Sequence, residues 1–198
     1  LGAQRGDAAA QAVAAAGMVL AIAVEYADYR GLHLWGKRLC TLAATSQSTD
    51  RHRWRVDAAR LALPCLDDAW GFDADSEARA EALFVALREA TAIPPDERLL
   101  LAKVLMDYES LQLDVPRIER LMALTHHHLH RAQASPRWQM RWWLLLLQNH
   151  EYFNQGAAAA EAQARAQALC TRHGLHDLRF ELACVELTLA IKADQQIK

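Results

Sequence analysis

Glycine and proline are scarce in this sequence, which has 8 Gly and 5 Pro among 198 residues. Alanine is abundant and no five-residue stretch alternates like a strand, so the composition favours helices. An excess of one charge is also lacking, since 22 Lys and Arg stand against 24 Asp and Glu. A net charge of −2 gives no general reason to bind nucleic acid or anionic lipid. The 53% hydrophobic content excludes a disordered chain.

Catalytic motifs are absent as well: the sequence contains no GxxxxGK[ST], GxGxxG, GxSxG or HExxH. The acidic stretch 73–77 resembles the start of a calcium loop, but glycine is missing at the sixth place and the twelfth, Phe84, cannot bind calcium. The neighbours Asp67 and Asp68 would project about 100° apart on a helix, so they do not form an acid–base pair. We therefore predict no enzymatic activity, no catalytic residue and no cofactor.

The four cysteines lack the short spacing of a zinc knuckle or a redox dithiol. Cys40, Cys65, Cys170 and Cys184 all have apolar neighbours in the sequence. We expect reduced, buried thiols that behave as small hydrophobic side chains, which places the protein in the cytoplasm.

A membrane-spanning run is also lacking. The most apolar stretch, 8–24, is interrupted by Gln11 and is rich in alanine. A bilayer span needs about 20 strongly apolar residues, so this stretch predicts a buried helix and no membrane association. The sequence starts at Leu1 and ends without a clear stop, and we expect it to be a fragment of a larger protein.

Apolar residues recur at three- and four-residue steps along almost the whole chain, which is typical of α-helices packed on one face. Start and end signals support this interpretation: Ser135-Pro136 is typical of a helix start, and His173-Gly174 of a left-handed helix end. The predicted helices cover about 8–29, 32–46, 50–70, 75–92, 95–112, 115–132, 136–154, 157–173 and 176–193.

The breaks between helices are regularly spaced. Gly31, Asp73, Asp114, Gly156 and Asp194 follow one another at intervals of 42, 41, 42 and 38 residues. A fixed period of about 40 residues with two helices per period is the signature of a helical solenoid, in which each hairpin stacks on the next.

We therefore predict an all-α superhelix of tetratricopeptide (TPR) type, a single domain over 1–198 with about four and a half helical hairpins. Residues 95–132 should overlay 136–173, one stacking layer apart, and the ninth helix should be half of a fifth pair. The aromatic residues expected at contacts between hairpins are Tyr108 and at least one of Tyr152 and Phe153.

One part of the pattern resembles a known group. Residues 142–147, 152–156, 168–170 and 173–175 look like parts of a long TPR-type repeat. They are similar to the repeats in the C-terminal superhelix of the maltose-system transcription activator and related bacterial signalling NTPases. Residues 137–193 match best, although the chain lacks the 34-residue consensus string Trp-x-x-Leu-Gly-x-x-Tyr and the proline at each repeat end.

The resemblance implies a superhelix that binds proteins or small inducers and regulates a neighbouring catalytic or DNA-binding domain. We expect a protein-interaction and regulatory module of a bacterial signalling or transcription-regulatory protein. Its partner would be another protein or attached domains of the same chain, bound along the concave face, and not nucleic acid directly. The alternative is a small-ligand (inducer) sensor with a tryptophan-lined pocket.

The helix predicted at 136–154 contains the candidate binding residues. Its tryptophans and four consecutive leucines predict a central, buried helix, although they could also form the wall of a ligand pocket. Arg141, Gln148 and Tyr152 recur at seven- and four-residue steps and would lie in one stripe. With Trp138 nearby, they are our candidates for a groove that faces a partner.

The histidine string 126–130 places His126 and His130 on one face of a helix, as two metal-binding imidazoles would require. No Glu or Cys lies nearby on that face to complete a site, so we predict a solvated stripe and no structural metal. The basic string 51–55 could bind nucleic acid through its interleaved aromatic residue. Because Asp50 and Asp57 flank it, we expect an ion-paired helix start, with a protein contact as the other alternative.

Overall fold

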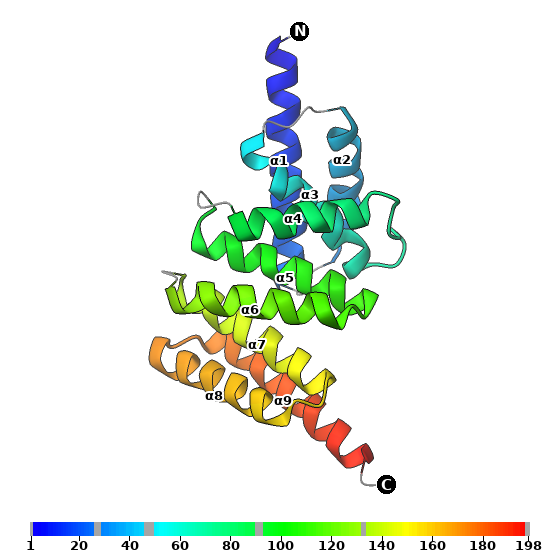
Figure 1. Cartoon of the computed structure of the whole chain (residues 1–198). Coiled ribbons are helices and arrows are strands. Elements are labelled where there is room, and N and C mark those ends of the chain that lie inside the picture. The colour runs from blue at the N-terminus through cyan, green and yellow to red at the C-terminus, as the bar shows by residue number, and fades with distance from the viewer. Residues whose placement is uncertain (1, 26–28, 46–49, 90–92, 132–133, 197–198) are drawn as a thin grey trace. The chain divides into compact units, whose positions relative to one another are not determined.

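The fold is all-α, as predicted. The computed structural model describes residues 2–25, 29–45, 50–89, 93–131 and 134–196, and these form nine α-helices and no strand (Figure 1). None of the helices described is long and apolar enough to cross a membrane. The helices are α1 Gly2–Glu25, α2 Leu32–Thr45, α3 Asp50–Leu66, α4 Ser76–Glu89, α5 Pro95–Gln112, α6 Val115–Arg131, α7 Pro136–Tyr152, α8 Gly156–His173 and α9 His176–Gln196.

The predicted helix ends hold where a local signal marks them. Ser135 caps α7, because its side chain accepts a hydrogen bond from the backbone N–H of Trp138. Gly174 ends α8 in the left-handed conformation, with φ 63°, and this is the αL cap that the sequence predicts. The helix expected to reach residue 70 ends at Leu66 instead. There the Asp67 side chain accepts a hydrogen bond from the N–H of Ala69 at 2.9 Å and closes a turn.

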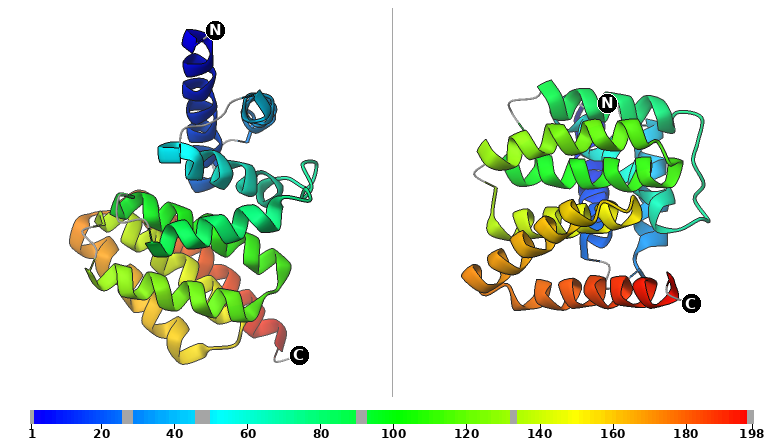
Figure 2. Two further views of the ribbon diagram at one scale, coloured as in Figure 1. Left: turned by 45° about the horizontal axis from the view of Figure 1, so that its top comes forward. Right: turned by 60° about the horizontal axis from the view of Figure 1, so that its bottom comes forward.

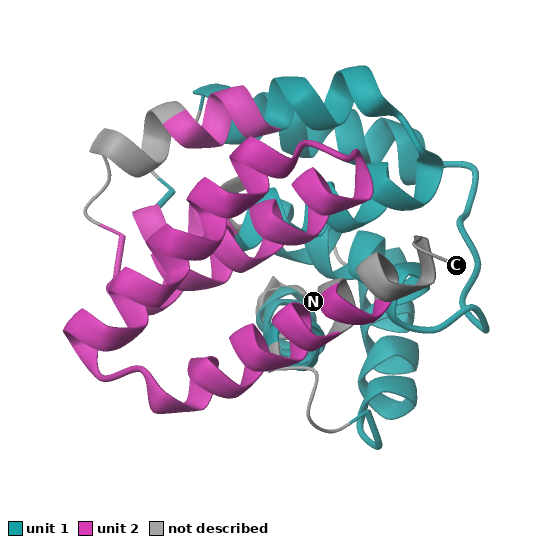
Figure 3. Cartoon of the chain, turned by 90° about the horizontal axis from the view of Figure 1, so that it is seen from below, with its two compact units in different colours: residues 1–93, 100–121 teal, residues 94–99, 122–198 magenta. Residues whose placement is uncertain are grey.

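The chain divides into two compact units (Figure 3). Unit 1 contains residues 1–93 and 100–121, and unit 2 contains 94–99 and 122–198. In unit 1, α1 packs on α2 and α3, and α3 also contacts α4. The buried face of α1 is largely alanine, which lets neighbouring helices approach closely.

One glycine in unit 1 marks such a close approach. Gly36 of α2 is buried, and a Cβ added to it would lie 2.7 Å from Cη2 of Trp70 and 2.9 Å from Cδ2 of Leu63. No real Cβ tolerates these distances, so the packing of α2 at this point depends on the missing side chain.

In unit 2, α7 contacts both α8 and α9 (Figure 2). All residues from Trp142 to Leu147 are buried, which confirms the prediction of a central, apolar helix. The buried face of α8 is formed by alanines and Cys170, whereas α9 contributes Leu178, Leu182 and Val185.

Candidate functional site

The four candidate residues of α7 do not share one environment. The Arg141 side chain is only 10% exposed, and its Nη2 lies 3.9 Å from Glu181 Oε1 of α9. Its guanidinium also lies over the ring of Trp138, 5.7 Å from the centroid. Arg141 is thus turned towards α9, whereas Gln148 and Tyr152 are exposed at the other end of α7.

The expected burial of aromatic residues holds only in part. Tyr108 is buried, as predicted, but Tyr152 is 58% exposed and Phe153 is half-buried. The Tyr152 and Phe153 rings meet edge to face, with centroids 5.2 Å apart. Tyr152 is the last residue of α7, and Phe153, as its C-cap, turns back to donate its N–H to the Asn149 carbonyl at 3.0 Å. The end of the helix therefore leaves Tyr152 in solvent.

Trp142 and Trp143 of α7 belong to the packed interior of unit 2, whereas Trp138 is half-buried. Trp142 and Trp143 are buried, and the Trp143 ring packs against His126 and Arg165. His126 meets it edge to face at 6.3 Å between centroids, and the Arg165 guanidinium lies 6.0 Å from its centroid. Trp143 is thus a packing and cation–π partner in this unit.

The histidine string is described only at His126, because the side chains of residues 127–130 lie outside the described residues. Within the part of the chain that is described, no group of three His, Cys, Asp or Glu side chains is placed to hold a metal ion. The absence of a structural zinc at His126 and His130 stays a prediction.

The basic string at the start of α3 is described from Arg53 onwards. Arg53 Nε lies 3.5 Å from Asp57 Oδ2, one helical turn away. The Arg55 guanidinium lies 5.3 Å from the centroid of Trp54. These contacts fit the ion-paired helix start, while the side chains of residues 50–52 lie outside the described residues.

The prediction that all four cysteines are buried is wrong. Cys170 is buried and Cys65 half-buried, but Cys40 and Cys184 are exposed, and none of these four described residues forms a disulfide. Apolar neighbours in the sequence do not show which side of a helix a residue occupies, and Cys40 and Cys184 lie on outward sides. Burial raises the pKa of the Cys65 thiol to about 12, so this thiol is protonated and unreactive.

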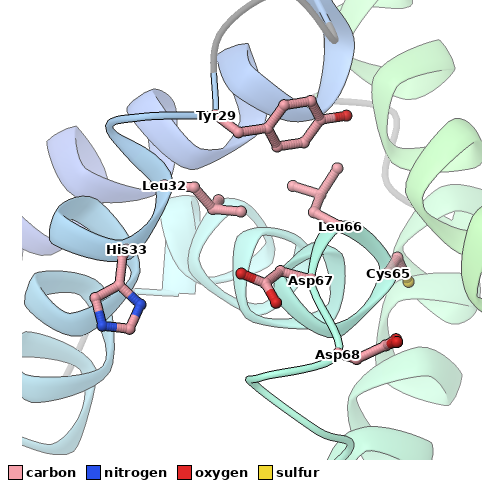
Figure 4. A pocket seen from close by; sticks show the side chains of 7 residues that line it. All are labelled: Tyr29, Leu32, His33, Cys65, Leu66, Asp67 and Asp68. Atoms are coloured by element: carbon pink, nitrogen blue, oxygen red, sulfur yellow. The ribbon is translucent and has the colours of Figure 1, made fainter.

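Unit 1 contains a hollow of about 440 Å³ where the start of α2 meets the end of α3 (Figure 4). In Figure 4 the carboxylates of Asp67 and Asp68 point in different directions, and Tyr29 lies on the α2 side. The His33 ring packs against Trp70, with centroids 5.6 Å apart. The residues that line this hollow are Tyr29, Leu32, His33, Cys65, Leu66, Asp67 and Asp68.

The electrostatics around this hollow favour a group that donates hydrogen bonds or carries positive charge. Asp67 and Asp68 are exposed carboxylates, and the adjacent Lys103 and Asp107 neutralise each other at 2.6 Å. Burial raises the pKa of the Tyr29 phenol, so it is a neutral hydroxyl that can donate or accept.

A second charged cluster in unit 1 surrounds Arg117. Its Nε lies 3.1 Å from Glu109 Oε1, its Nη2 lies 3.2 Å from Glu81, and its Nη1 pairs with Glu77. The Tyr108 hydroxyl donates to Glu77 at 3.1 Å. Glu109 Oε2 is buried without a hydrogen-bond partner among the described residues, and burial raises the pKa of Glu109 to about 7.

Asp73 links the loop between α3 and α4 to both helices through ion pairs. It pairs with Arg79 of α4 and, at 3.2 Å, with Arg60 of α3. The Ser76 hydroxyl donates to its Oδ1 at 2.9 Å. The hydrogen bonds from Arg79, the largest contribution, hold the pKa of Asp73 at about 2. The sequence suggested only a turn here, because nothing in it marks Arg60 and Arg79 as partners of Asp73.

Unit 2 has a hollow of about 650 Å³ between α8 and α9. On one wall, Glu186 Oε1 accepts hydrogen bonds from Gln163 and Gln167, both at 2.8 Å. Its lining residues are Gln167, Cys170, Thr171, His176, Arg179, Leu182, Ala183 and Glu186, and no tryptophan is among them.

Comparisons with protein-family models, curated proteins and solved structures give no match for this chain. The resemblance to long TPR-type repeats therefore stays an expectation from the sequence.

Proposed function

We propose that this chain is a protein-interaction and regulatory module of a bacterial signalling or transcription-regulatory protein, built as a TPR-like superhelix. The helix bounds support the repeat: α2, α4, α6 and α8 begin 44, 39 and 41 residues apart. In unit 2, the contacts of α7 with α8 and of α8 with α9 are those expected of stacked hairpins.

The exposed end of α7 is the observation that carries the proposal. At the C-terminal end of a helix whose middle is completely buried, the polar Gln148 and the aromatic Tyr152 are exposed. Tyrosine combines a large apolar ring with a hydroxyl group, and it is enriched at the energetic centres of interfaces. In our proposal, Gln148 and Tyr152 contact the partner, while Trp138 and Arg141 hold α7 against α9.

The test starts from a photoreactive phenylalanine analogue placed at Tyr152 in cells. We expect a covalent adduct with one defined protein, which is then purified for affinity measurements. Tyr152→Ala should weaken its binding by more than tenfold, because truncation of an interface tyrosine typically costs about 2 kcal/mol. Leu34→Ala is the matched control, since Leu34 is 66% exposed in unit 1. Adducts that form equally from positions 34 and 152, or equal affinities of both variants, would refute the proposal.

The hollow of unit 1 favours a second candidate, a small-ligand sensor. Its volume of about 440 Å³ lies within the usual range of ligand sites. Asp67, Asp68 and the Tyr29 hydroxyl would suit a ligand with an amino or guanidino group. To test this second proposal, small amines are added to the protein and NMR chemical shifts are recorded. An amine that binds should shift the backbone amide signals around Asp67, and Asp67→Asn should abolish these shifts. Shifts confined to other parts of the chain, or none, would refute it.

A further inference from the structure

Helix α9 has two apolar faces. The inner face, Leu178, Leu182 and Val185, is buried within unit 2. Nearly opposite on the helix, Phe180 is 74% exposed, Leu187 63% and Ile191 50%, and Cys184 is also exposed. Phe180, Cys184, Leu187 and Ile191 are named the outer stripe here. Figure 2 shows α9, in red, along its whole length in the right-hand view.

The outer stripe is too regular for scattered surface residues. Its members are separated by four, three and four positions, which places them in one line along a helix. This spacing is also that of the contact positions in coiled coils. An exposed stripe of this kind usually marks an interaction surface, whereas single exposed apolar residues need no explanation.

We propose that the outer stripe of α9 pairs with the outer stripe of a second copy of this chain, with the two helices antiparallel. The argument is the symmetry of the spacing: four, three, four reads the same in both directions. A two-fold axis through the middle of the stripe therefore places Phe180 against Ile191 of the second copy and Cys184 against Leu187 of that copy. Each apolar residue then meets an apolar residue, as a two-fold interface requires.

The residues beside the stripe fit the approach of an identical helix. Ala183 and Ala190 are exposed on one flank, and their small side chains allow two helices to lie close together. On the other flank, Glu181 already faces Arg141 of its own chain at 3.9 Å. None of the four residues of the outer stripe is charged, so pairing with a copy of itself brings no like charges into contact within the stripe.

The area of the stripe sets the expected strength of the pairing. Its four residues offer roughly 400 Å² of apolar surface, about half of the 800 Å² that each partner contributes to a standard stable interface. We therefore expect a weak dimer with a dissociation constant in the micromolar range, in which the monomer is well populated when dilute. This surface is separate from the exposed end of α7, so the proposal does not depend on the proposed function.

Sedimentation equilibrium of the full chain over a wide micromolar concentration range tests the pairing. The expected result is a reversible monomer–dimer equilibrium that Leu187→Glu weakens at least tenfold. Leu34→Glu, at an equally exposed leucine of α2, should leave it unchanged. Circular dichroism verifies that both variants are folded, and Phe180→Glu is the substitute if Leu187→Glu is not. A monomer at every concentration, or a dimer that neither stripe variant weakens, overturns the proposal.

Cysteine crosslinking tests the antiparallel arrangement. In a chain whose four cysteines are replaced by serine, Phe180→Cys and Ile191→Cys variants are prepared separately and mixed under mild oxidation. The mixture should form disulfide-linked dimers much faster than either variant alone, because only the mixed pair brings the two thiols together. Faster crosslinking of Phe180→Cys with itself would indicate a parallel pair and refute the geometry.

Discussion

Replacement of Glu109 by glutamine tests the charged cluster around Arg117. The Glu109 side chain is 4% exposed and lies beside Arg117, and its pKa is raised from 4.5 to about 7, chiefly by burial. Arg117 opposes this shift, whereas Glu77 and Asp114 add to it and Arg120 opposes it more weakly. A shift of this size corresponds to at most about 3 kcal/mol of pH-dependent stability.

The sign follows from proton binding. Between about pH 4.5 and pH 7, the folded protein holds a proton on Glu109 that the unfolded chain has released. The contribution of Glu109 to the free energy of unfolding is therefore fully present below pH 4.5 and is lost as the pH rises through about 7. Glutamine does not titrate, so Glu109→Gln should become more stable relative to the wild type as the pH rises.

Urea unfolding followed by circular dichroism at about pH 5 and pH 8 measures this change. We expect the stability difference between Glu109→Gln and the wild type to move by up to about 3 kcal/mol in favour of the variant. Glu81→Gln is the matched control, since Glu81 pairs with the same Arg117 but its side chain is 64% exposed. A difference for Glu109→Gln that is the same at both pH values would refute the burial argument.

Three further predictions concern the backbone and metal. Gly36→Ala should lower the free energy of unfolding, measured in urea, by about 1–3 kcal/mol, because the added Cβ would lie 2.7 Å from Trp70 Cη2. Gly17→Ala is the control: its Cβ would meet nothing within 4 Å, so this variant should not be destabilised. Leu113→Gly should raise the free energy of unfolding by roughly 0.5–1 kcal/mol, and with it the melting temperature, because Leu113 has a left-handed φ of 57°. A lower melting temperature would contradict this. EDTA should leave the melting temperature unchanged if the histidines of 126–130 hold no structural zinc, and a loss of several degrees would show that they do.

The helices could be predicted because the information that specifies them is local. Apolar spacing fixes the face that each helix buries, and Ser135 and Gly174 mark two ends through their own side chain or lack of one. The end of α3 at Leu66 was missed, because Asp67 forms its turn with its own side chain in a stretch that still has helical spacing. Turns closed by an aspartate side chain compete with continuation of the helix, and the difference in free energy between the two conformations is small.

The surroundings of single side chains could not be predicted, because they depend on residues distant in the sequence. Arg141 was expected to face a partner, yet it is turned towards Glu181, 40 residues further along the chain. Cys184 was expected to be buried, but a difference of one or two positions along α9 decides between its inner and its outer face, and of its two neighbours only Val185 points inward. The burial of Glu109 could have been expected from one weak indication in the sequence. Glu109 follows a nearly unbroken apolar stretch of α5, and such a stretch has to be buried on several sides.

The contrast between α7 and α9 determines the order in which unit 2 comes apart. Six consecutive residues of α7, Trp142 to Leu147, are buried, so we expect their amide hydrogens to exchange with solvent only when the whole unit opens. α9 packs on the rest of unit 2 through one face, with Leu178, Leu182 and Val185, so we expect it to detach before α7 and α8 separate. Both apolar faces of α9 would then be exposed together, so we expect aggregation to start from this local opening rather than from complete unfolding.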